Sequence, residues 1–204
     1  MKAGELDSMT DSQLVTRAQN GEVPAFEELV KKYQRDIYNL ACRIVADAEE
    51  ARDMAQQAFM QAFIHIKSFR QQSQFKTWLF RIAINQCYNF LKGRKKFGDP
   101  VEPEELHLVE EDSPETEVVA QDERRRLYAA LERLPAKQRA VLTLKVEQGL
   151  SYDEISEVLG GSAGAALVNY CQALKTLRKY LKSEEEHEVA VQTTPTVATR
   201  VSRR

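Results

Sequence analysis

The chain has 204 residues, of which 43% are hydrophobic, so it can bury the core of one medium domain or of two small ones. Its 29 Lys and Arg nearly balance its 31 Asp and Glu, for a net charge of −2. Membrane insertion is disfavoured, because the chain has no apolar stretch of ~20 residues. Its three cysteines are far apart and form no CxxC motif, which disfavours a disulfide framework and a zinc site. Since there is also no signal-peptide core near its start, a cytoplasmic protein is expected.

The first two predicted helices lie before residue 46. Leu14 and Ala18 have helical spacing and are followed by Gly21, a typical C-terminal stop. Pro24 suits the first turn of a second helix. From residue 26 to residue 45 apolar side chains recur every three or four positions, which predicts one broad buried stripe.

The third predicted helix begins at Asp47. Glu50 follows three positions later, a pattern similar to a capping box. Apolar residues from 51 to 66, Phe63 among them, have helical spacing and supply a buried face. The polar stretch at residues 68–74 then predicts a loop.

A fourth helix is predicted from residue 75 to residue 92, because its apolar residues again recur at three and four positions. Gly93 is expected to end this helix. Together the four helices predict an N-terminal domain at residues 1–96.

The middle of the chain, residues 97–122, is predicted to be a flexible acidic linker, since it has three prolines, many carboxylates and no sustained helical period. Residues 54–98 contain no Asp or Glu, whereas residues 124–182 contain eleven basic residues against five acidic ones. Two basic blocks with an acidic connector suggest two polyanion-binding units on a tether. The alternative is that the basic runs are merely solvated helix faces.

Residues 123–182 carry the sharpest local pattern. Ser151 and Glu154 form a capping box at the start of a short helix, and Gly160 and Gly161 make a tight turn before a last helix. Helix, short turn and helix is the helix-turn-helix pattern, whose second helix can lie in the major groove of DNA. The chain is thus predicted to be all-α, with two helical domains and a disordered tail at residues 183–204.

The outward face of the last helix is predicted to present amide, basic and small apolar side chains. Asn and Gln can pair with adenine edges, and Lys and Arg can meet phosphates. The alternative is a helical hairpin that packs on another protein. The candidate DNA-contacting residues are Ala165, Val168, Asn169, Gln172, Lys175, Arg178 and Lys179.

Basic and aromatic residues alternate between residues 69 and 92, a combination suited to single-stranded DNA, because rings stack on unpaired bases and cations follow the backbone. Trp78 and Phe80 taken singly fit a core better than a stacking platform. Asn85 and Asn89 lie one helical turn apart and can hydrogen-bond a base edge, although they also fit amides that simply face solvent.

Four motifs, in order along the chain, resemble the extracytoplasmic-function (ECF) subfamily of sigma-70 factors. Residues 47–59 are similar to the helix that binds core RNA polymerase, and residues 75–85 to the helix that melts the promoter. Residues 131–139 and 147–160 resemble the start of the second domain of these factors. The resemblance runs from about residue 12 to residue 182.

The resemblance implies a sigma factor rather than an enzyme. Such a factor needs no cofactor or small-molecule substrate, and it binds core RNA polymerase and the −10 and −35 promoter elements. The C-terminal domain would read the −35 element with the residues named above and dock on the polymerase flap, and an anti-sigma factor is a further implied partner. The other implied residues are Asp53, Gln56 and Gln57 for the clamp helices of the largest polymerase subunit, Gln71, Gln72, Ser73, Gln74, Asn85 and Asn89 for a flipped −10 base, and Lys92, Arg94, Lys95 and Lys96 for the adjacent phosphates.

The chain departs from the subfamily at two places. Leu167, Cys171 and Gln172 stand where Lys, His and Arg are frequent, which predicts fewer phosphate contacts at the −35 element and a smaller salt dependence. Residues 71–73 replace a loop that often carries Gly and an acid, so the base preference of the subfamily does not carry over.

Two other function classes are weighed against the sigma factor. A stand-alone DNA-binding regulator using residues 124–182 would bind DNA tightly without polymerase. A helical adaptor for acidic proteins would show no promoter specificity. Catalysis is disfavoured, because the sequence shows no nucleophile–base pair, no Gly-rich phosphate loop and no clustered metal-binding carboxylates, and the three histidines are isolated. They are His65, His107 and His187.

Overall fold

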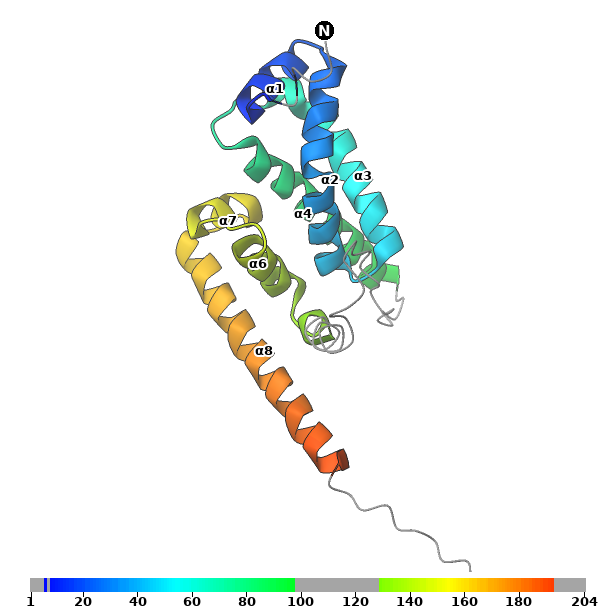
Figure 1. The fold of residues 1–204 in the computed structure, drawn as a ribbon, viewed down its shortest axis with the longest axis vertical. Coiled ribbons are helices and arrows are strands. Elements are labelled where there is room, and N and C mark those ends of the chain that lie inside the picture. Colours follow the sequence, from blue (N-terminus) through cyan, green and yellow to red (C-terminus); the bar gives the residue numbers. More distant parts are fainter. Residues whose placement is uncertain (1–5, 7, 98–128, 193–204) are drawn as a thin grey trace, which may run out of the picture.

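The computed structural model describes residue 6 and residues 8–97 and 129–192, without the side chains of residues 95–97 and 183–192. Every regular element in these ranges is a helix, which confirms the predicted all-α fold (Figure 1). In chain order the elements are α1 (Asp11–Gln19), α2 (Val23–Val45), α3 (Ala48–His65), the 3₁₀ helix η2 (Ile66–Ser68), α4 (Phe75–Phe97), α6 (Ala136–Val146), α7 (Tyr152–Leu159) and α8 (Ala163–Gln192).

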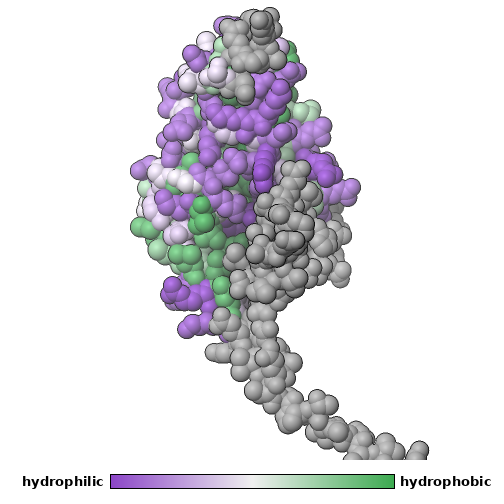
Figure 2. Space-filling view, in the orientation of Figure 1, coloured by the Kyte–Doolittle hydropathy of each residue, from purple (hydrophilic) through white to green (hydrophobic). Residues whose placement is uncertain are grey.

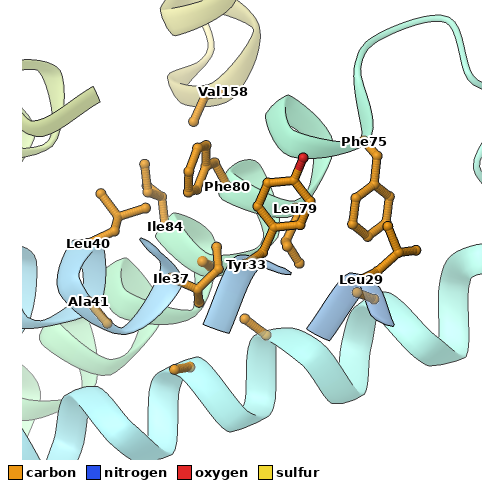
Figure 3. Packing of buried hydrophobic residues seen from close by; sticks show 14 of the residues in the cluster. Leu29, Tyr33, Ile37, Leu40, Ala41, Phe75, Leu79, Phe80, Ile84 and Val158 are labelled. Atoms are coloured by element: carbon orange, nitrogen blue, oxygen red, sulfur yellow. The ribbon is translucent and has the colours of Figure 1, made fainter. Parts of the chain in front are cut away.

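The N-terminal domain is built around α2. Leu29, Ile37, Leu40 and Ile44 follow the predicted apolar stripe, and none of their surface is exposed. Burying a side chain of this size contributes about 1.5–3 kcal/mol relative to leaving it in water. Helices α1, α3 and α4 pack around this stripe, and Figure 3 shows side chains from α2 and α4 meeting in the core.

The corner between α2 and α3 is fixed by local chemistry. Ala46 has a left-handed backbone (φ 59°), and its N–H donates to the carbonyl of Cys42, which ends α2. The Asp47 carboxylate then accepts hydrogen bonds from the N–H groups of Glu49 (3.0 Å) and Glu50 (2.9 Å). The predicted start of the third helix at Asp47 is therefore confirmed.

Two expectations about the N-terminal domain were wrong. Helix α4 does not end at Gly93 but continues to Phe97. A glycine costs a helix only about 1 kcal/mol relative to alanine, too little to stop one that is anchored by buried residues such as Ala83 and Cys87. Phe63 is 46% exposed rather than buried, because it lies at the rim of the α2–α3 contact, edge-on to Phe26 (ring centroids 5.0 Å apart).

The C-terminal half forms the expected helix-turn-helix. The Ser151 hydroxyl accepts a hydrogen bond from the Glu154 N–H, and the Glu154 carboxylate accepts one from the Ser151 N–H, so the capping box at the start of α7 is present. Gly160 (φ 73°) and Gly161 (φ 118°) turn the chain into α8 with backbone angles that side chains disfavour.

Helix α8 differs from its predicted pattern at two points. Leu174, expected on the buried stripe, is 39% exposed. The helix also runs past Lys182 to Gln192, through residues with good helix propensity and no Gly or Pro. Residues 193–204 of the predicted tail, and all of the predicted linker except Phe97, lie outside the described residues.

The two domains pack directly against each other. Helix α6 lies against α2, and α7 lies against α4. Val141, Leu144 and Ile155 belong to the same continuous core as the N-terminal helices, and Val158 points at Phe80 of α4 (Figure 3). The face drawn in Figure 2 is largely hydrophilic, with one apolar patch on its lower part.

Candidate nucleic-acid interface

The loop between η2 and α4 is held in place by α1. The Gln19 side chain donates to the carbonyls of Ile66 (2.9 Å) and Phe69 (2.7 Å), and Ser12 donates to the side-chain oxygen of Gln71 (2.9 Å). These contacts stabilise Gln71 in a left-handed conformation (φ 53°), which is uncommon for a residue other than glycine. The loop is therefore an ordered feature, and the role of α1 in fixing it was not predicted.

The loop presents its polar side chains to solvent. Gln71, Gln72 and Gln74 are exposed and Ser73 is half-buried, so all four predicted base-contacting residues of the loop lie at or near the surface. They line a hollow of about 640 Å³ together with residues of α1, the start of α4, and Glu154 and Glu157 of α7. The hollow brings the predicted −10 loop and the helix-turn-helix to one place.

An aromatic cluster supports the loop from beneath. Phe69 stacks on Trp78 (ring centroids 4.7 Å apart), and Trp78 also contacts Phe75 (5.7 Å). Phe69 and Phe75 are buried, while Trp78 is half-buried. The rings thus pack on one another beneath the loop rather than standing free to stack on bases, as the sequence suggested for Trp78.

Helix α4 presents one exposed polar stripe. Asn85, Asn89 and Lys92 are all exposed, and Arg81 is exposed one turn before Asn85. The two amides predicted to contact a base therefore face outward with a cation on either side. Arg81 was not predicted as a site residue, although its spacing of four from Asn85 gives a signal.

The remaining predicted cations of α4 are less accessible or not described. Arg94 is half-buried, with its guanidinium 5.7 Å from the ring centre of Phe90. For Lys95 and Lys96 the backbone is helical, but their side chains lie outside the described residues. Among the predicted phosphate contacts with described side chains, Lys92 is thus the exposed one and Arg94 the half-buried one.

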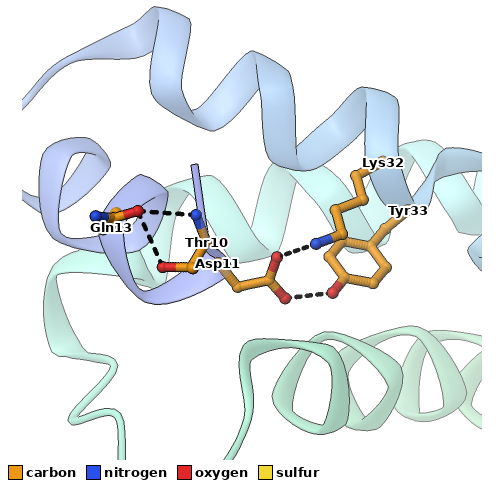
Figure 4. A network of polar contacts seen from close by, with 5 residues as sticks. All are labelled: Thr10, Asp11, Gln13, Lys32 and Tyr33. Atoms are coloured by element: carbon orange, nitrogen blue, oxygen red, sulfur yellow. Dashed lines mark hydrogen bonds and ion pairs between the residues drawn. The ribbon is translucent and has the colours of Figure 1, made fainter. Parts of the chain in front are cut away.

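Helix α1 is in turn fastened to α2 by Asp11. One carboxylate oxygen of Asp11 accepts from the Lys32 ammonium (2.5 Å), and the other accepts from the Tyr33 hydroxyl (Figure 4). Burial of Tyr33, and then its hydrogen bond to Asp11, raise the pKa of the phenol, so it remains a donor at neutral pH. This polar network sets α1 at the position from which it holds the loop.

The outward face of α8 is exposed as predicted, with one qualification. Asn169 is half-buried, and one of its two side-chain N–H groups donates to the carbonyl of Ala165 (2.7 Å), so that group is used within the helix. Leu167 is 44% exposed and Val168 54% exposed, which makes the first two turns of this face partly apolar. The exposed predicted residues are Ala165, Val168, Gln172, Lys175, Arg178 and Lys179.

The predicted polymerase-binding residues lie on α3, which forms one wall of an apolar groove with α2. Asp53, Gln56 and Gln57 are exposed, and Gln56 lines the groove, which has a volume of about 810 Å³. Its other lining residues include Met60, 56% exposed, and Phe63. The sequence did not predict this groove, because Phe59 and Phe63, two of its apolar residues, fit the same helical stripe as the core.

The described residues contain no group of three or more His, Cys, Asp or Glu placed to hold a metal ion. None of the described helices is long and apolar enough to cross a membrane.

Two family models match the chain. Sigma-70 region 2 matches residues 29–97, which contain most of the α2–α3 groove, the loop and the polar stripe of α4. Sigma-70 region 4 matches residues 124–177, which contain the helix-turn-helix. The RNA polymerase sigma-H factor of Pseudomonas aeruginosa is 37% identical over 181 residues, which are 84% of this chain and 94% of that protein.

The chain belongs to the sigma-70 family. The ECF RNA polymerase sigma-E factor of Escherichia coli K12 is 35% identical over 78% of this chain and 87% of its own length, and that of Haemophilus influenzae is 34% identical over 78% of this chain and 88% of its own. These relatives support the ECF subfamily that the motifs indicated. The protein is therefore a sigma factor, a transcription initiation factor that acts through RNA polymerase.

Two solved structures share the fold of this sigma factor. CnrH in complex with the cytosolic domain of CnrY covers 85% of this chain and 97% of its own, with a TM-score of 0.65. RpoE of Bartonella quintana, in complex with the anti-sigma factor NepR, covers 77% of this chain and 96% of its own, also with a TM-score of 0.65. Each is 23% identical to this chain.

Proposed function

We propose that this sigma factor directs core RNA polymerase to promoters by reading the −10 element with its N-terminal domain and the −35 element with its C-terminal domain, and that it promotes melting at the −10 element. The observation that carries the proposal is the exposed Asn85–Asn89 stripe beside an ordered polar loop, in a chain that also has a separate helix-turn-helix. A chain with two such faces can engage two promoter elements at once.

The −10 face suits the capture of an unpaired base. Asn85 and Asn89 offer donors and acceptors to a base edge, and Arg81 and Lys92 lie beside them for the phosphates. Taking one base out of the stack costs a few kcal/mol, and contacts to the extruded base offset that cost. Melting then needs no catalytic group, only a loop and a helix that are rigid before DNA binds.

The −35 face suits major-groove binding by α8. Gln172 is the exposed amide of the predicted set, and Lys175, Arg178 and Lys179 follow it toward the C-terminus of the helix. Amides specify a base, whereas these cations position the helix on phosphates. The exposed Leu167 and Val168 offer apolar rather than phosphate contacts at the start of this face.

The α2–α3 groove is the proposed docking site for the clamp helices of the largest polymerase subunit. An exposed apolar surface rimmed by polar residues is typical of protein-binding sites. Met60 and Phe63 would insert into the partner, while Asp53, Gln56 and Gln57 would supply its polar rim. An anti-sigma factor that covers the same groove is a second proposed partner, and docking of the C-terminal domain on the polymerase flap completes the proposed contacts.

Run-off transcription with purified core polymerase and a genomic fragment library tests this function. Start sites that appear only with the sigma factor would support it, and their upstream sequences would define both elements. Asn85→Ala is expected to reduce open-complex formation at the −10 element, and Gln172→Ala to relax selection at one −35 position by about 1–3 kcal/mol. Asn20→Ala, an exposed amide on neither face, is the control.

Core binding is tested separately by co-elution. Met60→Asp places a charge in the groove and is expected to abolish co-elution with core polymerase. Ile64→Asp is the matched control, since Ile64 is 62% exposed on the same helix but does not line the groove. Equal loss in both variants, or no new start site with wild-type protein, would refute the proposed function.

A further inference from the structure

The side-chain amide of Gln19 is fully used as a donor to the start of the loop at residues 69–74. Its two N–H groups meet the carbonyls of Ile66 and Phe69, which lie 47 and 50 positions later in the chain. An amide nitrogen carries two N–H groups, so both are satisfied. The carbonyl of Ile66 also accepts from the Phe69 N–H (3.1 Å), which closes the 3₁₀ turn. Gln19 thus holds η2 and the first residue of the loop as one unit.

The side chain of Gln71 is held by α1 through a second set of contacts. Its oxygen accepts from the Ser12 hydroxyl (2.9 Å), and its nitrogen donates to the Thr16 hydroxyl (3.3 Å). Ser12 and Thr16 are one helical turn apart, and the Thr16 hydroxyl donates in turn to the Ser12 carbonyl (2.8 Å). The backbone of Gln71 is left-handed (φ 53°), a conformation that costs free energy in a residue with a Cβ atom. These contacts offset that cost, so α1 selects the shape of the loop.

Two loop amides remain available to a base. Gln72 and Gln74 are exposed, and within the described part of the chain neither side chain has a hydrogen-bond partner. Each can offer a donor and an acceptor to a base edge. Gln71 has the same residue type, yet its oxygen and one of its N–H groups are already used. The three glutamines therefore divide into one that fixes the loop and two that can contact DNA.

Helix α1 does not depend on the loop for its own position. Leu14 and Val15 are buried in the N-terminal core, and Asp11 is bound to Lys32 and Tyr33 of α2 (Figure 4). The loop is anchored to α1, and α1 is anchored to the core. A change on the loop-facing side of α1 should therefore alter the loop without altering the rest of the domain.

We propose that α1 sets the base selectivity of this sigma factor at the −10 element. Gln19, Ser12 and Gln71 are positioning residues, which fix the loop without touching the base. Gln72 and Gln74 are the loop residues that contact the extruded base. The inference rests on the proposed −10 role of the loop and deepens it, because it identifies what holds the loop in the conformation that reads DNA.

The first test needs no DNA and measures the order of the loop in the full-length chain. Trypsin cleaves after Arg70, which is exposed in the loop, and cleavage requires the segment to open locally. Gln19→Ala should increase the rate of this cut about two- to tenfold, the range for the loss of a hydrogen bond. Asn20→Ala, at the exposed neighbouring amide, is the control. An unchanged rate in Gln19→Ala would overturn the anchoring.

The second test measures selectivity in the reconstituted holoenzyme. Run-off transcription first maps the −10 element. Fluorescence anisotropy then compares the affinity for a single-stranded oligonucleotide of that sequence with the affinity for versions changed at one base. Gln19→Ala and Ser12→Ala should each reduce the ratio of these affinities about two- to tenfold, with co-elution with core polymerase retained. Ser12 is exposed, so its variants keep the fold, and Ser12→Thr retains the hydroxyl and should retain the ratio.

A double-mutant cycle distinguishes a positioning residue from one that reads the base. If Gln71 acts through its contact with α1, Ser12→Ala should lower the ratio no further once Gln71→Ala is present. Gln72→Ala should lower the ratio by itself. Additive losses from Ser12→Ala and Gln71→Ala would overturn the inference. So would a loss of affinity in Gln19→Ala that is equal for every oligonucleotide, because the ratio would then be unchanged.

The outcomes separate this inference from the function on which it rests. If Asn85→Ala and Gln72→Ala lower the ratio but the variants of α1 do not, the −10 function stands and the role of α1 is refuted. If Gln19→Ala opens the loop to trypsin, yet wild-type holoenzyme shows no preference among the oligonucleotides, the −10 function fails. The selectivity inference then fails with it, while the anchoring of the loop stands.

Discussion

Replacing Phe80 with alanine should destabilise the protein by about 3–5 kcal/mol, the usual cost of removing a fully buried phenylalanine. Phe80 has no exposed surface, and it is enclosed by the N-terminal core on one side and by Val158 of α7 on the other. The Lys76 ammonium lies 5.5 Å from the ring centre and adds a cation–π attraction of about 0.5–1 kcal/mol. A loss of this size is a large fraction of the ~5–15 kcal/mol of a typical domain.

Urea unfolding, followed by circular dichroism and by Trp78 fluorescence, measures this loss. The midpoint should fall while the slope stays unchanged, since the variant changes contacts rather than the surface exposed on unfolding. Phe80→Leu keeps most of the apolar volume and should recover more than half of the loss. A cost below about 1 kcal/mol for Phe80→Ala would refute the burial of this ring between two packed domains.

Three further predictions concern single residues. Ser151→Ala should cost about 1 kcal/mol at neutral pH by removing the cap of α7. Because the Ser151 N–H and then its hydroxyl hold the pKa of Glu154 below its ordinary value, the contribution of this pair is present at neutral pH and should fade in acid unfolding curves below about pH 4.3. Gly160→Ala should cost roughly 1–3 kcal/mol in thermal unfolding, since φ 73° with ψ 144° is a backbone conformation that residues with a Cβ atom disfavour, although no neighbouring atom clashes. Arg81→Ala should reduce the salt slope of −10 strand binding by about 0.7, and an unchanged slope would remove Arg81 from the interface next to Asn85.

The sequence predicted those parts of the fold that are set by neighbours along the chain. Asp47 and Ser151 begin α3 and α7 because each cap is made by residues at most three positions away. The stripe of α2 was equally readable, since an apolar period of three to four needs no knowledge of the partner helix.

Contacts between distant residues were not predictable in the same way. Gln19 holds the loop through carbonyls 47 and 50 positions later, and Arg139 reaches a carbonyl 95 positions earlier. A lone polar side chain gives no sign of which distant backbone group it meets. The packing of the two domains against each other was likewise not predicted, because the charge pattern suggested two separate units.

Apolar patterning also could not distinguish a core from a binding surface. Phe63 and Leu174 fit the helical stripes of α3 and α8, yet 46% and 39% of their surfaces are exposed. The hydrophobic period marks the side of a helix that avoids water, whether that side meets its own chain or a partner. Exposed residues that continue a buried stripe are thus the positions at which a sequence-based core assignment fails and a docking surface begins.

The two proposed DNA faces differ in the chemistry that they offer, and this difference assigns them different roles. The −10 face has two exposed amides, Asn85 and Asn89, with cations beside them. On α8 Asn169 is half-buried and one of its two side-chain N–H groups is used by its own helix, so Gln172 is the exposed amide of this face, with a cation cluster that follows. Amides discriminate bases, whereas cations contribute affinity that salt weakens. Promoter selectivity should therefore reside mainly in the −10 contacts, while the −35 contacts chiefly strengthen binding.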